Sequence, residues 1–200
     1  HGYYGIGNAA PFDQVRQKTN GRAYQFVWSR PSAYMAALIR LVHWDDTKLD
    51  LFAKLYGAYN AIGVYAGSKL EEDLSNTTDS TLGDLLRGTR NHGSLRGTVG
   101  VVWDNRDHET APQRGMYHDI SLRSGGGLGS SFGYGQVNAT ARFFVPLVDR
   151  YLVLATRAMG DLIFGEPPFY VLAGHGGVNP NTATGGARSV RGVPSQRLHG

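Results

Sequence analysis

The sequence predicts an all-β protein, and more specifically an antiparallel transmembrane β-barrel. Three observations support this class. Segments of about ten residues alternate between apolar and polar side chains, the composition suits tight turns and aromatic girdles, and no apolar run approaches the ~20 residues of a membrane-spanning helix. The composition includes 28 glycines and 11 tyrosines, against 8 prolines and 3 methionines. If the chain crosses a bilayer, it must therefore cross it with strands.

The alternation is clearest between residues 134 and 145. Its polar phase is Tyr134, Gln136, Asn138, Thr140 and Arg142, and its apolar phase is Val137, Ala139, Ala141, Phe143 and Val145. The segment 152–164 repeats the pattern, with Arg157 and Asp161 opposite the apolar phase. The intervening residues 146–150 are too few for a crossover helix, so the two strands are predicted to pair as an antiparallel hairpin.

The same period of two residues predicts the remaining strands. They cover residues 23–28, 35–41, 49–56, 58–66, 95–104 and 116–123, which gives seven or eight strands in all. Short connections are predicted after Ser29 and Val145, and longer glycine-rich ones after Arg123 and Phe164. This alternation is typical of short periplasmic turns and long outer loops.

A soluble β-sandwich also has alternating strands, so alternation alone does not separate the two architectures. Strand length, turn lengths and the aromatic residues at strand ends favour the membrane barrel. Those aromatic residues are Trp28, Trp44, Trp103, Phe143 and Phe164.

Several function classes are excluded or disfavoured by composition. The absence of cysteine removes thiol catalysis, disulfides and Cys-ligated metal sites. The formal charge of +4 is spread over single Lys and Arg residues, which disfavours nucleic acid as a partner. Gly125–Ser131 is glycine-rich but lacks the Lys and the helix of a phosphate-binding loop, so an external loop is predicted there. We expect no enzymatic activity, no metal and no cofactor.

An ordered set of motifs resembles a known family. Val102-Trp-Asp-Asn-Arg-Asp107 is followed by Pro112-Gln-Arg-Gly-Met-Tyr117, and later motifs lie at residues 144–147, 154–157, 167–170, 176–177 and 189–192. Over about residues 94–200 the chain resembles the bacterial surface antigen superfamily, which contains the BamA, TamA and two-partner secretion transporter barrels. The resemblance implies a sixteen-stranded barrel, of which residues 1–200 would be an incomplete portion without periplasmic domains.

The resemblance also implies a role for Val190-Arg191-Gly192-Val193. In the family, a long loop carrying an Arg-Gly motif folds back into the lumen, and Arg191 would anchor that loop. A guanidinium offers five donors in a rigid fork, which suits it to carboxylates and tyrosines on an inner wall. The fourth position is usually aromatic in the family, and Val193 departs from this pattern.

A second motif, Asp104, Arg106, Asp107, Arg114 and Gly115, is predicted to form a periplasmic turn. We expect a structural role for it, in which the Asp side chains accept hydrogen bonds from turn amides and Arg106 pairs with a neighbouring carboxylate. The alternative is a docking edge for periplasmic domains.

The function implied by the resemblance is the assembly of outer-membrane proteins or the translocation of polypeptides, in the bacterial outer membrane. The expected partners are outer-membrane lipids, client polypeptides, and periplasmic accessory domains or subunits. The alternative is a passive pore, or a membrane anchor for a separate lipase-like domain.

Overall fold

The computed structural model describes residues 1–5, 12–76, 86–129, 132–149, 151–172 and 174. These residues form one strongly curved antiparallel sheet with three short helices. The strands are β1 (Phe26–Ser29), β2 (Ser32–Trp44), β3 (Thr47–Val64), β4 (His92–Asp104), β5 (Gly115–Leu128), β6 (Gly133–Val148) and β7 (Leu152–Gly165). The helices are α1 (Gln14–Thr19), α2 (Lys69–Ser75) and α4 (Phe169–Leu172). The predicted all-β class is confirmed.

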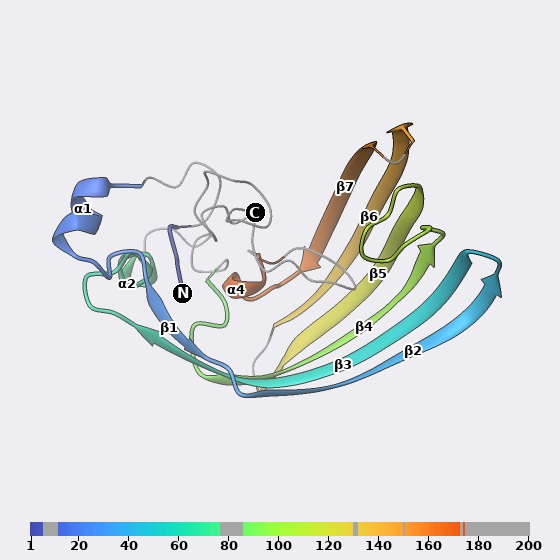
Figure 1. Cartoon of the computed structure of the whole chain (residues 1–200). Helices are drawn as coiled ribbons and strands as arrows, with labels where there is room; N and C mark the ends of the chain where they lie inside the picture. Colours follow the sequence, from blue (N-terminus) through green and yellow to red (C-terminus); the bar gives the residue numbers. More distant parts are fainter. Residues whose placement is uncertain (6–11, 77–85, 130–131, 150, 173, 175–200) are drawn as a thin grey trace.

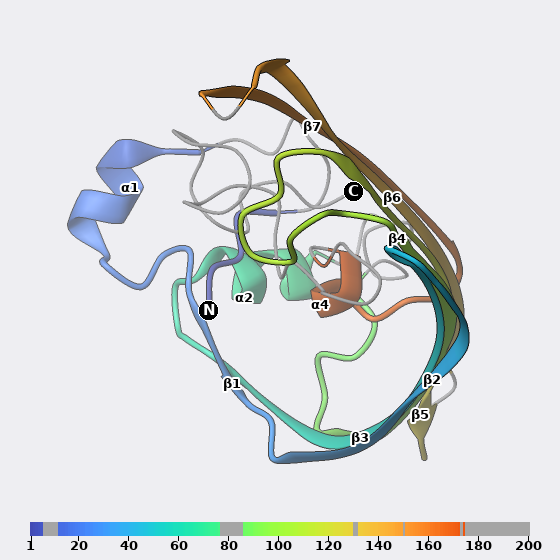
Figure 2. The ribbon, with the colours of Figure 1, turned by 45° about the vertical axis from the view of Figure 1, so that its right-hand side comes forward.

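The sheet has seven strands in the order β1-β3-β4-β5-β6-β7, with β2 also paired to β3. Figure 1 shows the sheet curling into part of a barrel, and Figure 2 shows α2, α4 and the N-terminus on its concave side. Every pairing is antiparallel. The described residues therefore form a partial barrel, as the sequence predicts.

The two faces of the sheet are inverted relative to a soluble protein. On the concave inner face, Thr98, Asp119, Arg123 and other polar side chains are buried, whereas the convex outer face exposes large apolar ones. Leu122 and Leu162, for example, are 50% and 72% exposed. Each such side chain would gain about 1.5–3 kcal/mol from transfer out of water. A β-sandwich buries its apolar phase, so the sandwich alternative is wrong.

The sheet has two distinct ends. We call the hairpin end the one that carries residues 45–46, 105–114, 149 and 151, and the loop end the one that carries residues 65–76, 86–91, 129, 132 and 166–172. Outward aromatic residues lie at both ends, with Trp44 and Trp103 at the hairpin end and Tyr59 and Phe164 at the loop end.

The predicted turn after Ser29 is wrong. Both β1 and β2 pair with β3, with Ser29 opposite Ala61 and Ser32 opposite Ala58, so the chain continues in one direction along the same neighbour. Pro31 separates the two strands because it has no N–H to donate to the ladder. Its carbonyl still accepts a hydrogen bond from the Tyr59 N–H at 3.0 Å.

Two further strand boundaries differ from the prediction. Residues 49–56 and 58–66 were expected as separate strands, but β3 runs through Gly57 without interruption. The predicted loop after Arg123 is also wrong, because Gly125, Gly126 and Gly127 continue β5. Gly125 lies opposite Tyr134, and a Cβ at Gly125 would meet the Tyr134 ring at 2.8 Å. An aromatic ring covering a facing glycine allows strand pairing to continue there.

Candidate functional site

The inner face is the candidate functional surface, and its buried polar groups are joined by hydrogen bonds. The Arg123 guanidinium donates to Gln136 Oε1 at 2.7 Å, and Gln136 Nε2 donates to Asp161 Oδ1 at 2.9 Å. Asn138 Nδ2 donates to the Gly160 carbonyl at 3.1 Å. Buried polar groups need such partners because an unpaired one costs about 1–3 kcal/mol. The wall is therefore a fixed polar surface that crosses β5, β6 and β7.

Tyrosine rings and guanidinium groups stack along the same face. The Arg106 and Arg142 guanidinium carbons lie 4.8 and 5.0 Å from the centre of the Tyr117 ring. Nearer the loop end, Arg30 and Arg96 both contact the Tyr56 ring, at 5.8 and 4.6 Å. Such contacts contribute about 0.5–2 kcal/mol each.

The predicted motif at residues 104–115 connects β4 to β5 at the hairpin end. Arg106 forms a bidentate ion pair with Asp104, with both nitrogen–oxygen distances at 2.8 Å. Asp107 Oδ1 accepts hydrogen bonds from the backbone N–H groups of His108, Gln113 and Arg114, at 2.9, 2.9 and 3.3 Å. The aspartates and Arg106 thus make the contacts that a structural role requires.

In the same connection, the pKa values of Arg106, Asp107 and Glu109 are shifted. The hydrogen bond from Arg106 to Asp104 raises the pKa of Arg106. Desolvation acts to raise the pKa of Asp107, but the three backbone N–H groups outweigh it and lower that pKa overall. These shifts favour the charged forms, so the connection keeps its ion pair and its amide cap at neutral pH.

Gly115 begins β5 with a φ of +106°. A Cβ there would clash with the Asn105 carbonyl oxygen and the Arg106 Cα, so glycine is required at this position. The Met116 N–H donates to Asn105 Oδ1 at 2.7 Å and closes the return of the chain. The Arg114 backbone hydrogen-bonds to Asp107 in both directions: its N–H donates to the Asp107 carboxylate at 3.3 Å, and its carbonyl accepts from the Asp107 N–H at 3.2 Å.

A cap, formed by the N-terminal residues, α2 and α4, covers the inner face at the loop end. We define the cap cluster as Tyr3, Phe26, Leu70, Leu86 and Phe169, all buried, with Trp28, Ile62 and Tyr170 packed against them. The Phe169 ring lies edge-on to Tyr3 and Phe26, with ring centres 6.0 and 5.3 Å apart. The cluster joins the N-terminus, α2 and α4, which are far apart in the sequence (Figure 2).

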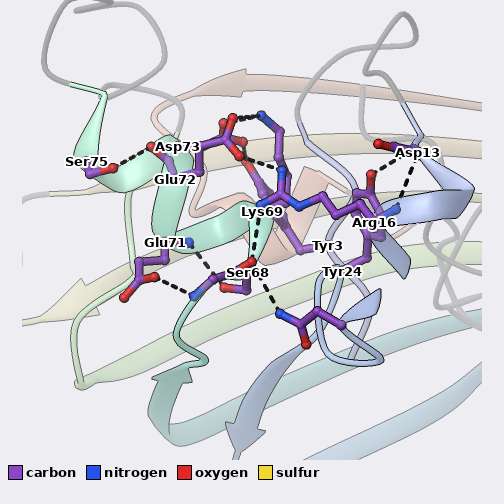
Figure 3. Close-up of polar contacts among 12 residues, drawn as sticks. Tyr3, Asp13, Arg16, Tyr24, Ser68, Lys69, Glu71, Glu72, Asp73 and Ser75 are labelled. Carbon is purple, nitrogen blue, oxygen red and sulfur yellow. Dashed lines mark hydrogen bonds and ion pairs between the residues drawn. The ribbon is translucent and has the colours of Figure 1, made fainter. Parts of the chain in front are cut away.

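Polar contacts hold α2 in the cap (Figure 3). The Tyr3 hydroxyl donates to Asp73 at 2.9 Å, and Lys69 forms an ion pair with the same carboxylate at 2.8 Å. Arg16, on α1, forms an ion pair with Glu72 at 2.6 Å. Burial, together with the Asp73 carboxylate, raises the pKa of Tyr3, and the hydrogen bond from Arg16 lowers the pKa of Glu72.

The helix α2 was not predicted, although its sequence carries a start signal. Ser68 is the N-cap residue, and its hydroxyl accepts from the Glu71 N–H at 3.3 Å. The Glu71 carboxylate accepts from the N–H of Gly67, the residue before the cap, at 2.7 Å. The pattern Ser68-x-x-Glu71 predicts a helix start, which the polar character of the segment obscured.

Val190, Arg191, Gly192 and Val193 lie outside the described residues, so the lumenal anchor remains a prediction. In the described part of the chain, His, Asp and Glu side chains nowhere gather in a group of three that could hold a metal ion. None of the described helices has the length and apolar character of a membrane span.

Comparison with known proteins identifies one family. The model of the Omp85 superfamily domain matches residues 42–198, which include both predicted motifs. Searches of curated proteins and of solved structures found no match.

Proposed function

Because this chain belongs to the Omp85 superfamily, a family of outer-membrane proteins that assemble or translocate other proteins, we propose that it does the same. In this proposal, its sheet forms part of a barrel in the bacterial outer membrane, and it inserts outer-membrane proteins or passes unfolded polypeptides. It acts without bond chemistry, cofactor or metal. Its partners are the surrounding lipids, the client polypeptides, and periplasmic accessory domains or subunits.

The inversion of the two sheet faces is the observation that carries the proposal. An outer face of Leu, Val, Ile and aromatic side chains suits lipid, and a buried polar inner face suits a lumen. Peptide segments in transit expose backbone donors and acceptors, and a wall of amide, hydroxyl and guanidinium groups can exchange hydrogen bonds with them. A sheet with apolar side chains on its concave face could not.

Arg191 is proposed as the anchor of a loop inside the lumen. The inner wall carries two carboxylates that suit a guanidinium, Asp119 on β5 and Asp161 on β7. Asp119 is 4% exposed, so a charge-assisted hydrogen bond to it is protected from water. We propose these carboxylates as the acceptors for Arg191.

The test is Arg191→Ala in the full-length protein, compared with Arg188→Ala and Arg197→Ala as matched controls. We expect the first variant to lose at least tenfold more client assembly or secretion than either control, while barrel folding stays intact by heat-modifiable gel migration. The double variant with Asp119→Asn should be no worse than the more defective of the two single variants, because both remove the same contact. Equal defects in the three arginine variants would overturn the anchor role.

The polar inner face is also what a passive pore requires, which keeps that alternative distinct and testable. A passive pore would conduct ions in planar bilayers equally well with and without the wild-type Arg191 and would support no client assembly. Retained assembly activity that depends on Arg191 would exclude it.

A further inference from the structure

A cavity of about 320 Å³ lies on the inner face at the loop end, beneath α4. Three arginines from three different parts of the chain line it: Arg30 after β1, Arg96 on β4 and Arg123 on β5. Five aromatic side chains also line it: Trp28, Tyr56, Phe132, Tyr134 and Tyr170. The volume is at the lower end of those that hold small organic ligands.

The charged side chains that line this cavity are positive. None of the described residues that line it is acidic. Arg30 and Arg96 have cation–π contacts with Trp28 and Tyr56 and, among the described residues, no ion pair with a carboxylate. Converging guanidinium groups in a cleft with low-dielectric walls raise the local concentration of anions.

The aromatic walls are fixed by hydrogen bonds at the rim of the cavity. Trp28 Nε1 donates to Asn60 at 3.1 Å, Asn60 in turn donates to Ser94 at 2.9 Å, and the Tyr170 hydroxyl contacts His92 Nε2 at 2.7 Å. The Tyr56 hydroxyl is buried and has no hydrogen-bond partner among the described residues. The cavity thus has aromatic rings held in place, arginine charges, and the Tyr56 hydroxyl, which can hydrogen-bond to a ligand.

We propose that this cavity binds an organic anion, in which a carboxylate or phosphate group is attached to an apolar or aromatic body. The oxyanion accepts hydrogen bonds from Arg30 and Arg96, whose planar guanidinium groups match carboxylate and phosphate geometry. The body packs against the aromatic walls beside Trp28 and Tyr170. Binding here is separate from the proposed transport role and would stand without it.

The probe is phenyl phosphate, titrated into the full-length protein in detergent. Of the 3 tryptophans in this sequence, Trp28 lines the cavity and the other two do not, so the background variant replaces every tryptophan other than Trp28 with Phe, Trp44 and Trp103 included. We expect a saturable change in Trp28 fluorescence that sodium chloride at matched ionic strength does not produce. Inorganic phosphate should bind at least fivefold more weakly because it lacks the aromatic body.

Arg96→Gln should weaken phenyl phosphate binding at least tenfold. Arg22→Gln is the matched control, because Arg22 makes a similar cation–π contact with Tyr65, at 4.7 Å, outside the cavity; it should change the affinity less than twofold. Arg30→Gln, at an exposed position after β1, gives a second cavity variant if Arg96→Gln does not fold. An absent saturable signal, an unchanged affinity in the folded cavity variants, or equal binding of inorganic phosphate would overturn the proposal.

Discussion

The hairpin end and the loop end of the sheet are stabilised in different ways. At the hairpin end, Asn105 and Asp107 accept hydrogen bonds from backbone groups no more than eleven positions along the chain. At the loop end, the cap joins Tyr3 to Phe169 through an aromatic cluster. The first is a local polar turn, and the second is a small nonlocal core. The difference implies that the hairpin end can form with its two strands, whereas the cap must wait for distant segments to meet.

The largest expected effect comes from breaking the cap. Phe169 is 1% exposed, so Phe169→Ala should destabilise the cap by about 3–5 kcal/mol. Limited proteolysis of the full-length protein in detergent should then cleave the cap much faster, while heat-modifiable migration reports an intact sheet. Phe143→Ala on the outer face is the control and should leave cap cleavage unchanged. Simultaneous loss of cap and sheet would show that the two ends are not separable.

A smaller effect is expected from straining the hairpin end. Gly115→Ala places a side chain at a φ of +106° and should lower the free energy of unfolding by about 1–3 kcal/mol. Urea unfolding in detergent can measure this change. Gly97→Ala is the matched control, because a Cβ there meets nothing within 4 Å. It should change stability by less than about 0.5 kcal/mol. If the two variants behave alike, the turn does not depend on the positive φ.

The smallest expected effect is a pH dependence confined to the cap. The hydrogen bond from Arg16 lowers the pKa of Glu72 below its ordinary value of 4.5. The stabilisation of the cap by the Arg16–Glu72 ion pair is therefore fully present above pH 4.5 and is lost as the pH falls through the lowered pKa of Glu72. Since the Glu72 side chain is about half exposed, we expect the ion pair to contribute less than about 1 kcal/mol to the stability of the cap.

Proteolysis of the cap with an acid-tolerant protease should accelerate below pH 4.5 in the wild type. Glu72→Gln should make this acceleration smaller. A pH profile unaltered by the substitution would assign the effect to other carboxylates.

Sequence periodicity predicted what depends on alternation within one strand. The phases of β4 to β7 are confirmed, including Gln136 inward and Val137 outward, because a period of two assigns each side chain to a face. The Asp104–Arg106 pair was also predictable, since both partners lie in one turn.

The sequence predicted much less of what depends on distant contacts. Nothing in the local pattern shows that Tyr3 meets Asp73, or that β1 shares β3 with β2. The cavity was missed for the same reason: Arg30, Arg96 and Arg123 looked like isolated charges along the chain, and only the curvature of the sheet brings them together.

The exposure of β2 matters for the proposed insertion of the protein into a membrane. All thirteen residues from Ser32 to Trp44 are exposed, including Met35, Leu38 and Ile39. In water, an exposed apolar strand at the edge of the described sheet is a template for pairing with other chains. In the proposed outer-membrane location, insertion into lipid must therefore be faster than self-association. An unfolded chain can collide either with a bilayer or with another copy of itself. The rate of self-association rises with the concentration of exposed chains, so a low concentration of such chains favours insertion.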